Sequence, residues 1–356
     1  MDKVFFIMCK GGIFMLQNET HDFTDIDEFL KYVDSQNTRD YVVSLKDLNF
    51  NIIDETLYLK VENDCYPVRI TALPSILNRI RVRGEGIDVL AYQNYDEELK
   101  EVLNALIQHC NEEPDGSKLD FRDNVSVMVS GESVNAINSS RYSHIPMQDI
   151  VSILLGIIDN CAYFEEQLNC AVRTDYQYTR IKFFTDKIYN FAGVDRKLVI
   201  MLKNSENGQG ACQLLAGFAE DETRTIESPI ILIMAPQSTV HSGSNNIDVV
   251  SDNFSRVEAS IEKAVLDVKR LEDIEIKNPG TTAIKVGKAI GLPQKYIDYL
   301  KDEWSSTSDP TNAAELFISF NDAISKVVKG NEETVEQYQR NNVLKILGIK
   351  NWEKYI

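Results

Sequence analysis

The sequence predicts an α+β fold, with a mixed or antiparallel sheet core, flanking helices, a small helical N-terminal unit and an α-helical C-terminal region. Two patterns support this class. Apolar residues alternate with period 2 through much of the segment 121–250, and they recur with the helical period of 3.6 after residue 250. Hydrophobic residues make up 43% of the 356 residues, which is enough for a sizeable core. We expect three regions, at 1–120, 121–250 and 251–356.

The first region, 1–120, is expected to be a mixture of strands and helices. A short helix follows Thr24, and a second helix follows Thr71, with Pro74 in its first turn. The clearest amphipathic helix covers 95–110, and its apolar face is formed by Leu99, Val102, Leu103, Leu106, Ile107 and Cys110. The polar run "NEEPDGSK" that follows places the first boundary near residue 120.

The second region, 121–250, is expected to supply most of the strands. A hairpin with Gly131 near its turn is followed by a helix that Pro146 introduces. Further strands are expected at 161–173, 176–184, 197–203, 211–218 and 228–236. The strand at 197–203 is apolar on both faces, which is typical of a central strand.

The third region, 251–356, is expected to be helical. Apolar side chains form a long stripe from 254 to 271, and a helical hairpin turns at Gly291. A DNA-reading helix-turn-helix is the alternative for this hairpin, but the acids Asp298, Asp302 and Glu303 in its second helix would repel phosphates. The remaining helices are expected after Pro310 and from about 332 to 347.

Charge and cysteine content indicate a cytoplasmic protein without a membrane partner. The chain has 37 Lys and Arg against 55 Asp and Glu, a formal net charge of −18, so any nucleic-acid site must be a local basic patch. The six cysteines form no C-x-x-C pair and are expected to be buried free thiols. The apolar N-terminal run is interrupted at Gly11 and Gly12 and is too short to span a bilayer.

No recognisable catalytic motif is present, so we expect a protein that is not an enzyme and needs no cofactor or metal. A P-loop and an H-E-x-x-H zinc motif are both absent, and the four histidines lie far apart in the sequence. One enzymatic alternative stays open, because a pocket that held His144 or His241 beside a carboxylate would supply a general base.

The run "TDYQYTRIKFF", residues 174–184, combines aromatic and basic residues. Read as a strand, it places Tyr176, Tyr178, Arg180 and Lys182 on one face. Tyrosine rings can stack on bases while Arg and Lys neutralise phosphates. The alternative is an ordinary exposed sheet face. The expected nucleic-acid-binding residues are Tyr176, Tyr178, Arg180 and Lys182, with help from Arg79, Arg81, Arg83 and Arg141.

Three stretches resemble the phage/plasmid-like protein family of unknown function. The residues that carry the likeness are Thr71, Ala72, Leu77, Leu99, Leu103 and Asn104, then Ser140-Arg141-Tyr142 with Ile145-Pro146, and finally Thr311, Phe317, Phe320, Asn321 and Ala323. Ser319 departs from the family's usual Asn, and the aromatic-Gly pair is missing. The resemblance implies an origin in a mobile element and an α+β core with a helical tail, but it implies no activity.

Two functions follow from these observations. The first is a non-catalytic phage or mobile-element protein, expected to be a homo-oligomer, that binds single-stranded nucleic acid in annealing or protection. The alternative is an acidic structural or interaction protein, such as a virion component or an inhibitor of a host defence protein, whose negative surface docks on a basic partner.

Overall fold

The computed structural model describes most of the chain. The described residues are 15–80, 87, 90, 95–111, 124–142, 144–160, 169–205, 207, 210–220, 224–239, 247–254, 256–305, 309–328 and 332–356. Within them, antiparallel strands and helices are mixed and the C-terminal part is helical, so the predicted α+β class is confirmed.

The largest sheet is antiparallel throughout and positions the candidate site. Its strands are β1 (His21–Phe23), β8 (Asn169–Thr174), β9 (Thr179–Phe191), β10 (Val194–Asn204), β11 (Cys212–Glu220), β12 (Ile231–Leu232) and β13 (Gln237–Thr239). The order is β1-β8-β9-β10-β11-β12, and β13 also pairs with β11. The central position predicted for the strand around 197–203 is confirmed, because β10 pairs with both β9 and β11.

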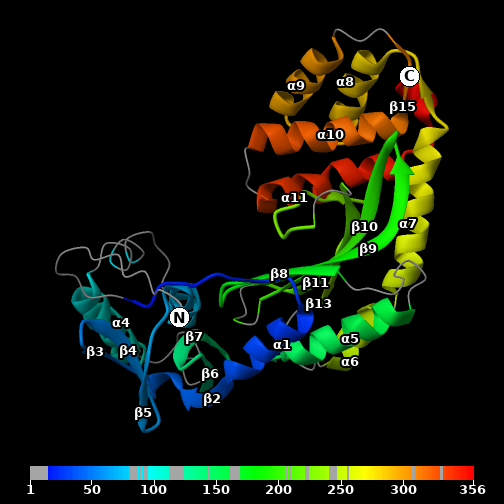
Figure 1. The fold of residues 1–356 in the computed structure, drawn as a ribbon. Helices are drawn as coiled ribbons and strands as arrows, with labels where there is room; N and C mark the ends of the chain where they lie inside the picture. Colours follow the sequence, from blue (N-terminus) through cyan, green and yellow to red (C-terminus); the bar gives the residue numbers. More distant parts are fainter. Residues whose placement is uncertain are drawn as a thin grey trace.

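The first face of this sheet is apolar and forms the main core. Ile181, Phe183 and Ile200 point to this side, where they pack with helices α1 (Ile26–Ser35), α5 (Met147–Asn160), α6 (Ile247–Phe254), α7 (Val257–Glu272) and α10 (Ala313–Val328). Figure 1 shows α1, α5 and α6 at one end of the sheet and α7 running along its side toward the C-terminal helices. Strands and helices that are far apart in the sequence thus share one core.

The C-terminal helices stack at the far end of α7 (Figure 1). They are α8 (Pro279–Ala289), α9 (Gln294–Trp304), α10 and α11 (Glu332–Asn341), with short pieces at β14 (Glu275–Ile276), β15 (Thr311–Asn312), η3 (Val343–Gly348) and η4 (Trp352–Lys354). Gly291 has φ +76° between α8 and α9, a left-handed conformation that suits glycine, as the predicted tight corner requires. Tyr296 of α9 is fully buried against Tyr338 of α11, so this helical hairpin is part of the core.

A second, smaller lobe lies beside the main sheet (Figure 1). It contains the sheets β2-β6-β7 and β3-β4-β5 with a core of its own. Its elements are β2 (Arg39–Ser44), η1 (Leu45–Asp47), β3 (Asn49–Ile53), β4 (Thr56–Val61), β5 (Asp64–Pro67), η2 (Ile70–Ala72), α2 (Leu73–Arg79), α4 (Asp96–Asn111), β6 (Asn124–Ser130) and β7 (Ser133–Ser139). Because β2 pairs with β6, the packing crosses the boundary expected near residue 120.

Several element ends differ from the sequence expectations for local reasons. Asp25, and not Thr24, caps α1, since its Oδ1 accepts the backbone N–H groups of Asp27 and Glu28 at 2.7 and 3.1 Å. Strands β9 and β10 form a long hairpin whose turn, Ala192-Gly193, has φ +51° and +73°. Because several residues between 185 and 190 are polar, the sequence did not indicate that β9 continues to Phe191. The strand expected at 228–236 is short, because only Ile231–Leu232 pairs with β11.

Two further expectations concern thiols and membranes. Cys170 and Cys212 are buried free thiols, and burial raises their pKa to about 11 and about 12, whereas Cys65 is exposed, contrary to the expectation of burial. None of the helices in the described ranges combines the length and apolarity that a bilayer crossing requires.

Candidate binding face

The two tyrosines lie in the turn before β9, not in the strand, so the predicted strand start at residue 176 is wrong. Asp175 Oδ1 accepts the backbone N–H groups of Gln177 and Tyr178 at 3.1 and 2.8 Å, and this bonding closes a turn. Tyr176 has φ +61°, a left-handed conformation that is rare for a bulky residue. The alternation of side chains therefore applies only from Thr179 onward.

Tyr176 contacts the small lobe instead of facing solvent as a free stacking platform. The guanidinium carbon of Arg69 lies 3.6 Å from the centre of its ring, and Arg69 itself donates to Ser133 Oγ at 2.7 Å and Gln17 O at 3.0 Å. Burial raises the pKa of Tyr32, and a hydrogen bond with Tyr176 raises it further. A base could stack on this side of Tyr176 only by displacing Arg69.

Arg180 belongs to a row of cations that crosses the second face of the sheet. Arg173 of β8 is the register partner of Arg180 of β9, and Arg180 is the partner of Lys203 of β10. Register partners point to the same face, so these three residues, here called the cation row, lie side by side. Asp22 of β1 extends the row beyond Arg173, and Gln213 of β11 extends it beyond Lys203.

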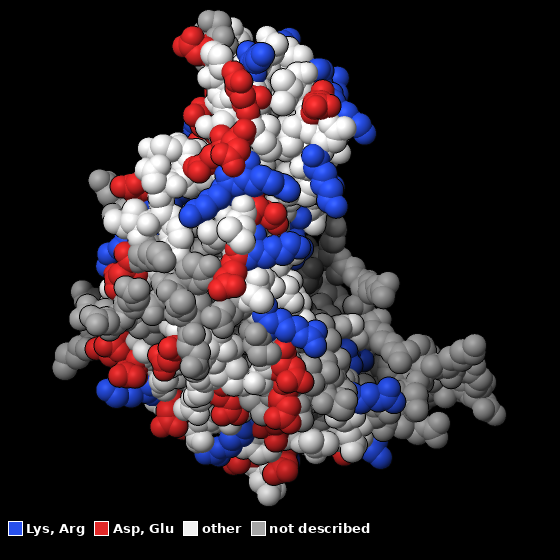
Figure 2. All heavy atoms as spheres, turned by 90° about the vertical axis from the view of Figure 1, so that its right-hand side faces the viewer, with Lys and Arg blue, Asp and Glu red and all other residues white. Residues whose placement is uncertain are grey.

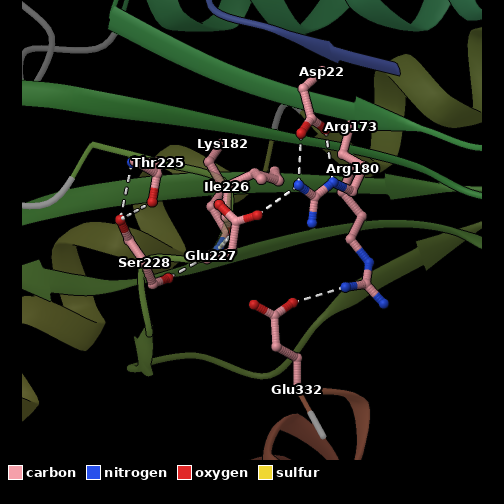
Figure 3. Close-up of polar contacts among 9 residues, drawn as sticks. All are labelled: Asp22, Arg173, Arg180, Lys182, Thr225, Ile226, Glu227, Ser228 and Glu332. Atoms are coloured by element: carbon pink, nitrogen blue, oxygen red, sulfur yellow. Dashed lines mark hydrogen bonds and ion pairs between the residues drawn. The ribbon is translucent and has the colours of Figure 1, made fainter. Parts of the chain in front are cut away.

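Each member of the cation row is held by a carboxylate from another element, and Figure 3 shows the pairs of both arginines. Arg173 donates to both Asp22 oxygens, at 2.7 and 2.6 Å, and to Glu227 Oε1 at 2.5 Å. The hydrogen bonds from Arg173 lower the pKa of Asp22 and of Glu227, and the bond with Asp22 raises the pKa of Arg173. These interactions keep all three groups charged near neutral pH.

The other two pairs come from one helix. Glu332 Oε2 lies 2.8 Å from Arg180 Nη1, and Glu336 Oε2 lies 2.9 Å from Lys203 Nζ. The two glutamates are four positions apart on α11, a spacing that puts them on one side of the helix. Glu332 and Glu336 therefore pair with Arg180 and Lys203, which lie on the neighbouring strands β9 and β10.

Three of the four carboxylates are more exposed than the arginines that they bind. The side chains of Glu227, Asp22 and Glu332 are 60%, 54% and 46% exposed, whereas those of Arg173 and Arg180 are 35% and 28% exposed. A molecule that approaches this face meets negative charge first. Figure 2 shows another side of the molecule, on which acidic and basic side chains of the described residues are interleaved.

Lys182 is buried, so the prediction that it lies on an exposed face is wrong. Its side chain is 3% exposed, and Nζ donates to the carbonyl oxygens of Ile226 and of Ser228 (Figure 3). The turn at 225–228, which Ser228 Oγ closes by accepting the Thr225 N–H at 3.0 Å, presents these carbonyls. Burial lowers the pKa of Lys182 to about 8.

Two of the remaining predicted cations, Arg79 and Arg141, are not on this sheet. Arg79 is the last residue of α2, and Arg141 is an exposed residue just after β7, so both belong to the small lobe. Arg81 and Arg83 lie outside the described residues. The main cluster of cations thus comprises Arg173, Arg180 and Lys203, of which the sequence had put only Arg180 in the site.

His144 does lie beside a carboxylate, but the arrangement differs from a catalytic triad. Its Nδ1 is 3.2 Å from Asp40 Oδ2, and Ser126 Oγ donates to Asp40 Oδ1 at 3.1 Å. The aspartate stands between serine and histidine, so the histidine is not placed to take the serine's proton. His241, the other histidine named for the enzymatic alternative, lies outside the described residues.

A cavity among the described residues adjoins the cation row. It has a volume of about 440 Å³ and lies between α11, the ends of β10 and β11, and the turn that precedes β9. Its lining includes Tyr178, Lys203, Gln213, Glu333, Glu336, Gln337 and Arg340. A smaller cavity, about 40 Å³, lies between the lobes beside Tyr176. Within the described ranges, no group of three or more His, Cys, Asp or Glu is arranged to hold a metal ion.

No family model, curated protein or solved structure matches this chain. The resemblance to the phage/plasmid-like family therefore stays a prediction, as do the mobile-element origin and the homo-oligomeric state.

Proposed function

We propose that this chain is a non-catalytic interaction protein whose acidic surface docks on a basic surface of a partner protein. The observation that carries the proposal is the layering of charge on the second face of the sheet. Asp22, Glu227 and Glu332 lie outermost, while the cations that could hold phosphates lie beneath them and are already paired. The net charge of −18 adds long-range attraction for a basic partner.

A binding titration with a Lys/Arg-rich probe peptide tests this function. The variant Asp22→Asn/Glu227→Gln/Glu332→Gln removes three outer carboxylates from the face. The control Asp54→Asn/Glu55→Gln/Glu62→Gln removes three exposed carboxylates from the small lobe, so both variants have the same net charge. We expect the first variant to lose about tenfold in affinity and the control to lose much less. Equal losses would mean that net charge alone attracts the probe, and they would contradict a docking face.

Binding of single-stranded nucleic acid is the second candidate, and the alignment of Arg173, Arg180 and Lys203 in one row favours it. A strand could follow these cations if its phosphates displaced the carboxylates, since the exposed ion pairs are individually weak. Fluorescence anisotropy with an oligothymidine at low salt checks this candidate. Tight binding by the unmodified protein that weakens steeply with added salt would support it over docking.

A further inference from the structure

The cavity under α11 has features of a small-molecule site that neither candidate function uses. Its volume of about 440 Å³ falls within the usual range for ligand pockets. Most of the residues that line it come from β10, β11 and α11, so regular elements fix most of its walls. Its lining is mainly polar and includes side chains of both charges.

One wall is an aromatic ring. Tyr178 is half-buried beside the cavity, and Gly210 approaches the ring so closely that a Cβ there would lie 3.2 Å from Tyr178 Cε1. Burial raises the pKa of Tyr178, and the negative charge of Glu333 raises it further, which places that carboxylate near the ring. A flat ligand ring that stacked on Tyr178 would therefore have a hydrogen-bond acceptor at its edge.

The opposite end of the cavity supplies a cation. Arg340 lies on α11 seven residues after Glu333, so the two are about two helical turns, or ~10 Å, apart along the helix. Between them, Lys203 and Glu336 already neutralise each other at 2.9 Å. Among the described residues, no hydrogen bond or ion pair occupies the Arg340 guanidinium or the Glu333 carboxylate.

We propose that this cavity binds a nucleoside monophosphate whose base carries an exocyclic amino group. The base would stack on Tyr178, its amino group would donate to Glu333, and the phosphate would bind the guanidinium of Arg340. The distance between these side chains along α11 is comparable with that between the amino group and the phosphate of such a ligand. Gln213 and Gln337, which also line the cavity, can bond the ribose hydroxyls. This site does not depend on the proposed protein partner.

Isothermal titration calorimetry on the full chain tests the site, with AMP, IMP, CMP, UMP and cytidine as the probes. AMP is expected to bind at least tenfold more tightly than IMP, and CMP more tightly than UMP, because IMP and UMP bring a carbonyl toward Glu333. Cytidine, which lacks the phosphate, is expected to bind at least tenfold more weakly than CMP. Absence of binding by both AMP and CMP at millimolar concentration would overturn the proposal.

Variants assign the roles within the cavity. Tyr178→Ala and Arg340→Gln should each reduce AMP affinity at least tenfold, while Arg256→Gln, which removes an exposed arginine elsewhere, should leave it unchanged. Glu333→Gln should remove most of the preference for AMP over IMP, a result that a purely structural role would not give. Equal weakening by Arg340→Gln and Arg256→Gln would overturn the site, as would binding of inorganic phosphate as tight as that of AMP. Circular dichroism confirms that each variant is folded.

Discussion

The two faces of the large sheet are built on different principles, although they share the same strands. The first face is apolar and packs on helices through Ile181, Phe183 and Ile200. On the second face, small apolar clusters surround Lys182 and the cation row. The adjacent residues Phe183 and Phe184 thus lie in different environments, the first in the main core and the second in a small apolar cluster on the other face. Burial thus stabilises the first face, while the second face combines burial with ion pairs to distant parts of the chain.

The largest expected effect comes from the first face. Phe183→Ala should reduce the free energy of unfolding by about 3–5 kcal/mol, because a fully buried ring is removed from the main core. Phe184→Ala should reduce it by less, since Phe184 belongs to a small cluster under the turn at 225–228 that can relax. Urea denaturation measures both values. A larger loss for Phe184→Ala would reverse the ranking of the two faces.

The next effect is a pH dependence from Lys182. Its pKa is about 8 in the folded protein against an ordinary value of 10.5, so between these pH values the unfolded chain binds more protons. The stability of the wild type relative to Lys182→Met should therefore rise as pH increases from 8 to 10.5, by about 3 kcal/mol at most. Denaturation of both proteins at several pH values checks this. A difference that falls or stays flat across this window would contradict the burial of a charged amine.

A smaller effect is expected where the two lobes meet. Arg69→Met should destabilise the protein by about 1–3 kcal/mol, because it removes the bonds to Ser133 Oγ and Gln17 O and the cation over Tyr176. Tyr176→Phe keeps the ring and should have a lesser effect. Thermal unfolding ranks the two variants, and limited proteolysis reports whether the lobes loosen. Equal stability of Arg69→Met and wild type would show that this contact does not join the lobes energetically.

The smallest effect is expected from the exposed ion pairs. Arg180→Gln and Glu332→Gln should each change the free energy of unfolding by no more than about 1 kcal/mol, with a coupling of about 0.2–1 kcal/mol in a double-mutant cycle. A coupling well above this range would mean that the pair anchors α11 on the sheet. The cation row would then be a structural feature rather than a surface that meets a partner.

The sequence predicted the apolar face well, because side-chain periodicity is a local property. It identified β8, β9 and β10, the hairpin at Gly131 and the C-terminal helices. It did not predict that Lys182 is buried, since the groups that satisfy its amine are backbone carbonyls 44 and 46 positions away. Asp175 was a usable signal for the turn at 175–178, because aspartate side chains often bond backbone N–H groups two residues on.

The acids of the candidate face could not be assigned from the sequence. Asp22 and Glu332 lie 151 and 152 positions from the arginines that they bind. The spacing of Glu332 and Glu336 indicates one helix face, but it does not indicate which cations that face meets. The basic residues of the run 174–184 are evident in the sequence, whereas their neutralisation depends on tertiary packing.

The charge layering is tested most directly by anisotropy of a labelled oligothymidine at low salt, with wild type compared to Asp22→Asn/Glu227→Gln/Glu332→Gln. These carboxylates lie over Arg173 and Arg180, so their neutralisation should expose two cations. We expect little binding by wild type and a gain of at least tenfold in the variant, reversed by salt. Equal affinity of the two proteins would contradict the claim that the carboxylates determine what this face can bind.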